Sequence, residues 1–140
     1  MLYVDTSVPV ALHTPEAKSG AVSRWYAACA EQLVSAAWCV SEFASALGIK
    51  QRTGQIDEVV AQTARRQFER MCAGDLYLLP VEATTLHRAA ILSLDVASGL
   101  RAGDSLHLAA ALDAKAKGMA TLDEVMAKNV KRLKFKLVAF

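Results

Sequence analysis

The 140-residue sequence has few residues that can cross-link a fold or break its helices and strands: three cysteines, three prolines and seven glycines. The cysteines are odd in number and form no C-x-x-C pair, which argues against a disulfide framework and against a structural zinc site. Neither sign of charge dominates, because 16 basic and 14 acidic residues leave a net charge of +2. No overall field therefore commits the chain to nucleic acid.

Long hydrophobic runs are also missing. No apolar stretch is long enough to cross a bilayer, and the segment 1–5 reaches an acid without the basic and apolar regions of a signal peptide. We therefore expect a cytoplasmic protein. Hydrophobic residues make up 54% of the chain, which is enough for a sizeable core and too much for disorder. At this length we expect a single domain over residues 1–140.

Short apolar segments alternate with segments of helical periodicity. We expect strands at 2–5, 33–36, 76–79, 119–122 and 136–140. After a short first helix that contains Pro9, we expect helices at 15–31, 38–52, 55–73, 82–97, 104–118 and 123–131. This alternation predicts βαβ units. The fold class is therefore α/β, a three-layer α/β/α sandwich around a central, mainly parallel sheet of about five strands.

Two acidic residues follow predicted strands. Asp5 ends the first strand, and Asp123 comes directly after the fourth. Ligands of open parallel sheets collect at the carboxyl ends of the strands. We therefore expect both carboxylates at the same edge of the sheet.

Two further acids lie on predicted helices. At about 100° per residue, Asp104 shares the apolar side of its helix with His107. Glu42 lies on one stripe with Ser45 and Ile49, so we expect both acids to point inward.

A buried carboxylate is costly unless it is paired, protonated or bound to a metal. The four acids have few cations near them in the sequence, and an oxygen-only ligand set favours Mg²⁺ or Mn²⁺. Such sites typically carry out phosphoryl-transfer chemistry with a metal-activated water. Taken singly, each acid is better explained as a helix cap or as a partner of a helix dipole. Only the four together indicate a site.

Four segments match a known family in its order, namely 3–7 (YVDTS), 41–47 (SEFASAL), 100–111 (LRAGDSLHLAAA) and 120–123 (ATLD). Over essentially the whole chain, the sequence resembles the PIN-domain ribonucleases, specifically the VapC-like toxins of toxin–antitoxin modules. The resemblance implies an endoribonuclease that depends on Mg²⁺ or Mn²⁺. Its catalytic and metal-binding residues would be Asp5, Glu42, Asp104 and Asp123.

The same resemblance implies supporting residues and partners. Ser7 and Thr121 match polar positions that hold the carboxylates. The expected partners are an RNA substrate, a second copy in a homodimer, and a cognate antitoxin that inserts a segment into the groove and blocks activity. Arg101 lies three residues before Asp104 and is either a phosphate contact or a surface arginine ahead of the helix. His107 lies one turn from Asp104, and it is either a packed histidine, which we favour, or a hydrogen-bond donor to a carboxylate of the site.

Other small α/β functions fit less well. A receiver domain needs an aspartate at the end of its central strand, but Leu79-Pro80-Val81 follows the third strand here. A phosphatase with a D-x-D nucleophile needs an acid where Ser7 stands. A non-catalytic module that binds RNA or a protein partner stays open as the alternative. Because no pair of histidines is evident, we expect cleavage by water rather than by the 2′-hydroxyl of the RNA.

Overall fold

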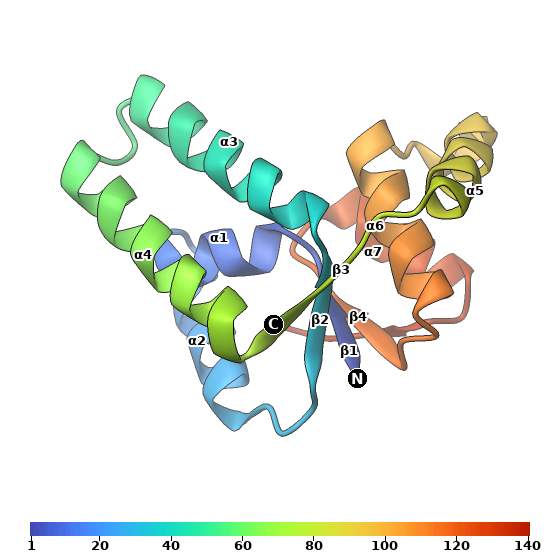
Figure 1. The fold of residues 1–140 in the computed structure, drawn as a ribbon, viewed down its shortest axis with the longest axis horizontal. Helices are drawn as coiled ribbons and strands as arrows, with labels where there is room; N and C mark the ends of the chain where they lie inside the picture. Colours follow the sequence, from blue (N-terminus) through green and yellow to red (C-terminus); the bar gives the residue numbers. More distant parts are fainter.

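The structure, a computed structural model, describes residues 1–140 as a five-stranded sheet covered by helices on both faces (Figure 1). The predicted α/β class is confirmed. The strands are β1 (Leu2–Val4), β2 (Leu33–Ala36), β3 (Leu76–Leu79), β4 (Gly118–Ala120) and β5 (Lys136–Leu137). The helices are α1 (Ser7–His13), α2 (Ser19–Ala28), α3 (Trp38–Arg52), α4 (Glu58–Gly74), α5 (Ala83–Leu94), α6 (Ala102–Asp113) and α7 (Glu124–Arg132), with a 3₁₀ turn η1 (Val96–Ser98).

All the strands run parallel, in the order β3-β2-β1-β4-β5. Central β1 places Tyr3 opposite Val34 of β2 on one side and opposite Met119 of β4 on the other. The chain first builds outward from β1 to β3 and then returns to pair β4 with the free side of β1. The strand order therefore reverses between β1 and β4, which is where doubly wound sheets bind their ligands.

The alternation of side chains along β1 divides the core into two layers. Val4 faces the larger apolar cluster, which contains Phe43 of α3 and Phe68 of α4. Tyr3 faces the opposite cluster with Leu108 of α6. Helices α1 to α4 thus cover one face of the sheet and α5 to α7 the other, as Figure 1 shows. Both faces of β1 are consequently buried, so its carboxyl end emerges deep inside the molecule.

Helices α3 and α4 form a hairpin that extends away from the sheet (Figure 1). The rings of Phe43 and Phe68 stack between them, with centroids 4.0 Å apart. The chain turns back near Gly54, whose φ of +74° lies in the left-handed region that favours glycine. Because this hairpin packs on the sheet through its aromatic face, another side of α3 remains free to border the switch point.

Element boundaries differ from expectation where local hydrogen bonds end a helix. The helix predicted at 15–31 is shortened to α2, because the side chain of Ser19 bonds the backbone of Thr14 and Glu16 in a turn. The predicted helix at 82–97 ends at Leu94, and the Asp95 carboxylate then accepts from Ala97 N. Pro9 lies within the first turn of α1, where helix N–H groups have no partner to lose. No helix has the length and apolar character needed to cross a membrane.

Candidate active site

The four predicted acids line one pocket of about 440 Å³ at the carboxyl ends of β1 and β4. Asp5 follows β1, Glu42 lies on α3, Asp104 lies on α6 and Asp123 follows β4. Ser7, at the start of α1, lines the same pocket. Residues that are more than one hundred positions apart in the sequence therefore meet at the point where the strand order reverses.

Asp5 is the most buried of these acids, with 4% of its surface exposed. Burial raises the pKa of Asp5, while the charge of His107 and hydrogen bonds from Ser7 and Thr121 oppose that rise. The Ser7 amide, 2.8 Å away, and the Ser7 hydroxyl both donate to Oδ1, and the Thr121 hydroxyl donates to Oδ2. These three donors leave an acceptor position on Oδ2, because each carboxylate oxygen has two lone pairs.

Ser7 and Thr121 connect Asp5 to the rest of the pocket wall. Ser7 Oγ accepts from Leu122 N at 2.8 Å, and Thr121 Oγ1 accepts from Asp123 N at 3.0 Å. The loop after β4 is therefore fixed to the start of α1 through two side chains that also contact Asp5. In the structure both side chains contact one of the four carboxylates, that of Asp5.

Glu42 is held by a hydrogen-bond chain that begins in the core. Thr6 Oγ1 and His107 Nε2 each lie 2.5 Å from Glu42 Oε2, and the Tyr3 hydroxyl lies 2.8 Å from His107 Nδ1. Burial alone would raise the pKa of Glu42, but the bond and charge of His107, with the bond from Thr6, hold that pKa below its ordinary value. Glu42 is therefore kept ionised.

The same series of hydrogen bonds engages both ring nitrogens of His107. The Ala36 N–H donates to the Tyr3 hydroxyl oxygen at 2.9 Å, and the same hydroxyl is hydrogen-bonded to His107 Nδ1. His107 Nε2 faces the Glu42 carboxylate, which can only accept, so this nitrogen carries a proton and donates it to Glu42. Burial raises the pKa of Tyr3, which keeps its hydroxyl a donor. His107 is packed, as expected, at 3% exposure, but it also positions an acid, a role that the sequence prediction underestimated.

Asp104 stands among like charges. Burial raises the pKa of Asp104, and the nearby charges of Asp123 and Glu42 raise it further. The preceding residue, Gly103, lets α6 approach α3, since a Cβ at that position would lie 2.8 Å from Glu42 Oε1. The lack of a side chain at Gly103 thus allows two acids on different helices to face the same space.

Of the two acids predicted to lie on inward-facing sides of their helices, Asp104 fits the prediction and Glu42 does not. The neighbours of Asp104 on α6 are buried, including His107. Glu42 is only half-buried, and its stripe partners Ser45 and Ile49 are exposed, so the expectation that this stripe faces the core is wrong. The core side of α3 instead carries Phe43 and Leu47. The stripe that contains Glu42 and Ile49 instead lines a wide polar pocket, which the helical period alone does not reveal.

The capping interpretation of the acids also holds in the structure. Asp104 Oδ2 accepts from Arg101 N at 3.2 Å, and Asp123 Oδ1 accepts from Met126 N at 2.7 Å at the start of α7. Asp104 and Asp123 can therefore both cap a helix and belong to the site, because one carboxylate oxygen accepts from the backbone while the other remains for the pocket. The side chain of Arg101 is exposed, and Arg101 is not among the residues that line the pocket.

The donor set of the pocket fits a hard divalent cation. No three His, Cys, Asp or Glu side chains form a preformed metal cluster, and hydrogen bonds from the protein engage Asp5, Glu42 and Asp123. Asp104 Oδ1 and Asp123 Oδ2 receive no hydrogen bond from the protein. Mg²⁺ commonly retains several waters and needs only one or two direct carboxylates. Repelling carboxylates spread around a pocket match an ion that is bound partly through water.

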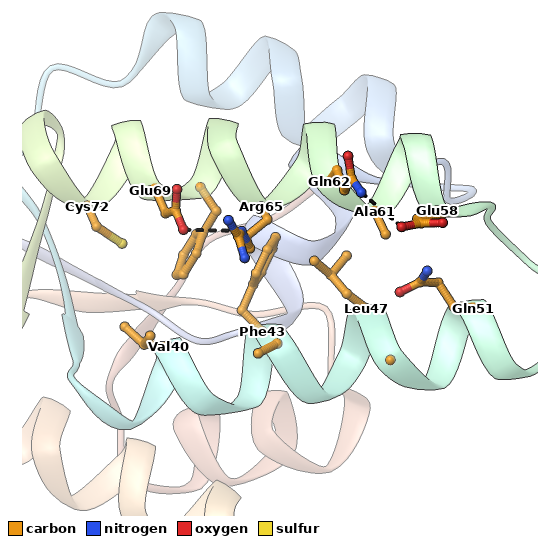
Figure 2. Close-up of a pocket in the computed structure, with 13 residues that line it drawn as sticks. Val40, Phe43, Leu47, Gln51, Glu58, Ala61, Gln62, Arg65, Glu69 and Cys72 are labelled. Atoms are coloured by element: carbon orange, nitrogen blue, oxygen red, sulfur yellow. Dashed lines mark hydrogen bonds and ion pairs between the residues drawn. The ribbon is translucent and has the colours of Figure 1, made fainter.

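A second pocket, of about 570 Å³, lies between α3 and α4 (Figure 2). Val40, Phe43 and Leu47 of α3 face α4 across it, and Arg65 and Glu69 pair at its edge. None of the four acids lines this pocket. It is an apolar groove with a polar rim, separate from the acidic pocket.

The comparisons with known proteins agree on the fold. A family model described as PIN domain matches residues 2–132. The structure of Mycobacterium tuberculosis VapC20, described as a Sarcin-Ricin loop cleaving toxin, is similar with a TM-score of 0.75 and 15% identity over 92% of this chain and 95% of that one. A toxin–antitoxin complex from Klebsiella pneumoniae is similar with a TM-score of 0.65 and 14% identity over 99% and 97%. Comparison with curated protein sequences finds no match.

The Tyr3–His107 hydrogen bond yields the first prediction. Tyr3→Phe should lower the free energy of unfolding by about 1–3 kcal/mol, since it leaves the buried Ala36 N–H and His107 Nδ1 without a partner. Urea unfolding measures this change, with Tyr77→Phe as the control because Tyr77 is 59% exposed. Nitrogen NMR of the His107 ring should show a shifted Nδ1 resonance, because Nδ1 loses the Tyr3 hydroxyl, while Nε2 stays protonated against Glu42. Equal stability of the two variants would contradict the network.

Proposed function

Since the chain belongs to the PIN domain family, we propose that it is a Mg²⁺- or Mn²⁺-dependent endoribonuclease and the toxin of a toxin–antitoxin module. One observation carries the proposal: Asp5, Glu42, Asp104 and Asp123 come from four separate segments and line one pocket at the strand switch point. The description of VapC20 as a Sarcin-Ricin loop cleaving toxin supports RNA as the substrate class.

The residues divide the work as follows. Asp5 and Asp104 are the proposed main ligands of the metal, and Glu42 and Asp123 complete the shell, partly through waters. When bound, the metal would neutralise charge at the scissile phosphate and ease deprotonation of the attacking water. The donors to Asp5 and to Glu42 described above keep both carboxylates aimed at the pocket.

The positions of the histidines favour attack by water over attack by the 2′-hydroxyl of the RNA. Catalysis by 2′-hydroxyl attack is served by a paired base and acid. His107 is the one histidine that lines the pocket, and both its ring nitrogens are engaged by Tyr3, Thr6 and Glu42. His13 instead packs edge-on against Phe43 and Phe68.

The apolar groove between α3 and α4 is the surface we assign to the antitoxin. Its floor contains Phe43, Leu47 and Phe68, while Gln62 and Arg65 stand at the rim (Figure 2). An amphipathic helix binds such a groove with its apolar face and leaves its polar face to the rim. The similar structure from Klebsiella pneumoniae is described as a toxin–antitoxin complex, which supports a partner of this kind.

The proposal includes a homodimer in the cytoplasm. Large apolar side chains are exposed on α5, where Leu86, Ile91 and Leu94 are 52%, 69% and 79% accessible. Large apolar side chains that are exposed on one helix are candidates for a protein–protein contact. We assign this face of α5 to the contact between two copies of the chain.

Removal of single carboxylates tests the proposed site. Asp5→Asn or Asp104→Asn should lower the rate of RNA cleavage about 100-fold or more, which corresponds to a loss of about 3 kcal/mol of transition-state stabilisation. Neither variant should be less stable, because both acids have raised pKa values and their ionised forms weaken the fold at neutral pH. Cleavage of a single-stranded RNA and urea unfolding measure the two effects.

The matched control is Glu124→Gln, an exposed residue one position after Asp123 that does not line the pocket. It should cleave RNA at the wild-type rate. Wild-type cleavage by Asp104→Asn would reject the site. A wild-type protein that binds RNA without cutting it in Mg²⁺ or Mn²⁺ would favour the non-catalytic binding module instead.

Metal addition should stabilise the protein in proportion to binding. At a concentration about 100 times the Kd, Mg²⁺ or Mn²⁺ should add about 2.7 kcal/mol and raise the Tm by several degrees. Asp104→Asn should lose most of this increment. EDTA should stop cleavage, and the products should carry 5′-phosphate and 3′-hydroxyl ends. An unchanged Tm with no heat of binding, or 2′,3′-cyclic phosphate ends formed in EDTA, would reject the metal-dependent reaction.

Two exposed valines provide a matched test of the groove. Val40 lines the groove at 46% exposure, whereas Val59 is 71% exposed outside it. The probe is the product of a short neighbouring reading frame that encodes a DNA-binding protein, coexpressed with this chain. Val40→Glu should weaken binding at least about tenfold, or about 1.4 kcal/mol, because a charge enters an apolar contact. Val59→Glu should bind normally. Equal affinities would place the partner elsewhere.

A further inference from the structure

Lys50 is a buried cation at the far end of the acidic pocket. It lies in the last turn of α3, on the same pocket wall as Glu42, and only 8% of its surface is exposed. Its ammonium is 2.7 Å from Glu16 Oε1 and 3.5 Å from Gln55 Oε1. Lysine is seldom this buried unless it is paired, and the Glu16 carboxylate supplies that pairing here.

Stability alone explains this lysine poorly. The desolvation cost of a buried ion pair roughly offsets its attraction, and an apolar pair of similar volume is often as stable. Glu16, the partner of Lys50, belongs to the turn between α1 and α2, and its side chain is 33% exposed. The ion pair is thus buried on the lysine side and open to solvent on the carboxylate side.

The excess of acidic residues in the pocket suggests that Lys50 binds an anion there. Five acids line the pocket, and Lys50 is the one lysine or arginine among its lining residues. An RNA strand is a polyanion, so its backbone needs positive charge along the path through an acidic pocket. The four acids of the proposed site would be neutralised by metal. Lys50 is the remaining positive charge at the opposite end.

The distance along α3 indicates which phosphate Lys50 reaches. Glu42 and Lys50 are eight residues apart, which corresponds to about 12 Å along a helix axis. The Lys50 ammonium contacts Glu16 and Gln55 and none of the four acids of the proposed site. It is placed for a phosphate elsewhere along the same strand.

We propose that the Lys50 ammonium is a binding subsite for a backbone phosphate that flanks the scissile phosphate, and that this phosphate replaces the Glu16 carboxylate as its partner. The inference rests on the proposed ribonuclease function. Exchange of one anion for another leaves the buried ammonium paired throughout, so no uncompensated charge arises. An ammonium accepts a phosphate as a point charge, without the directional demand of a guanidinium.

The experiment measures KM and kcat for a single-stranded RNA over a series of salt concentrations at constant Mg²⁺. Lys50→Met keeps the length of the side chain and removes its charge. We expect KM to rise about tenfold with kcat within about twofold, and the slope of log KM against log salt to fall by about 0.7, as for one phosphate contact on a single strand. Lys50→Arg should restore the slope. Lys18→Met, an exposed lysine outside the pocket, should behave as wild type.

Glu16→Gln tests the same pair from its exposed side, and the glutamine amide oxygen can still accept a hydrogen bond from the Lys50 ammonium. It removes the competing carboxylate, so KM should fall severalfold with an unchanged kcat. Unchanged KM and salt slope in Lys50→Met, or an unchanged KM in Glu16→Gln, would overturn the subsite and leave a purely structural ion pair. The proposed function fails separately, through absence of cleavage by the wild-type protein in Mg²⁺ or Mn²⁺.

Discussion

A carboxylate buried at the end of the central strand is the constraint on which the site depends. Asp5 emerges from β1 with helices on both sides and almost no access to water. An ionised group in such a place needs donors, and the chain supplies them from the start of α1 and from the loop after β4. Those same donors bind the backbone of Leu122 and Asp123. The need to satisfy one charge therefore fixes the edge of the sheet where the pocket opens.

Glu42 is supported differently, from inside the sheet rather than from the loops. The Tyr3 hydroxyl accepts from the backbone of β2 and is hydrogen-bonded to His107, which in turn is hydrogen-bonded to Glu42. Rotation of the Glu42 carboxylate would break a bond inside the core, so the core opposes it. Asp104 and Asp123 combine backbone caps with an oxygen free for the pocket. Each acid is thus held by the fold through one part of its carboxylate, and the other part faces the pocket.

Much of this arrangement could be predicted from the sequence, because the relevant signals are local. The strands at 33–36 and 76–79 and the helix at 38–52 have the predicted bounds, since each is a continuous apolar or periodic run next to a clear breaker. The grouping of Asp5 with Asp123 follows from parallel topology. The roles of Tyr3, Gly103 and Lys50 could not be predicted, because each depends on a contact between elements whose packing no local pattern encodes. The prediction that the Glu42 side of its helix faces the core was wrong for a related reason, since a helical period does not distinguish a core from a pocket.

The strand order has a consequence for synthesis of the chain. β1, β2 and β3 form three of the five strands from the first 79 residues, but Asp104, Thr121 and Asp123 come from the last third of the chain. Until β4 pairs with β1, Asp5 lacks the Thr121 donor and the pocket lacks Asp123. A nascent or truncated chain therefore contains the first two acids without a site. The pocket is completed only when nearly the whole polypeptide has been made and folded.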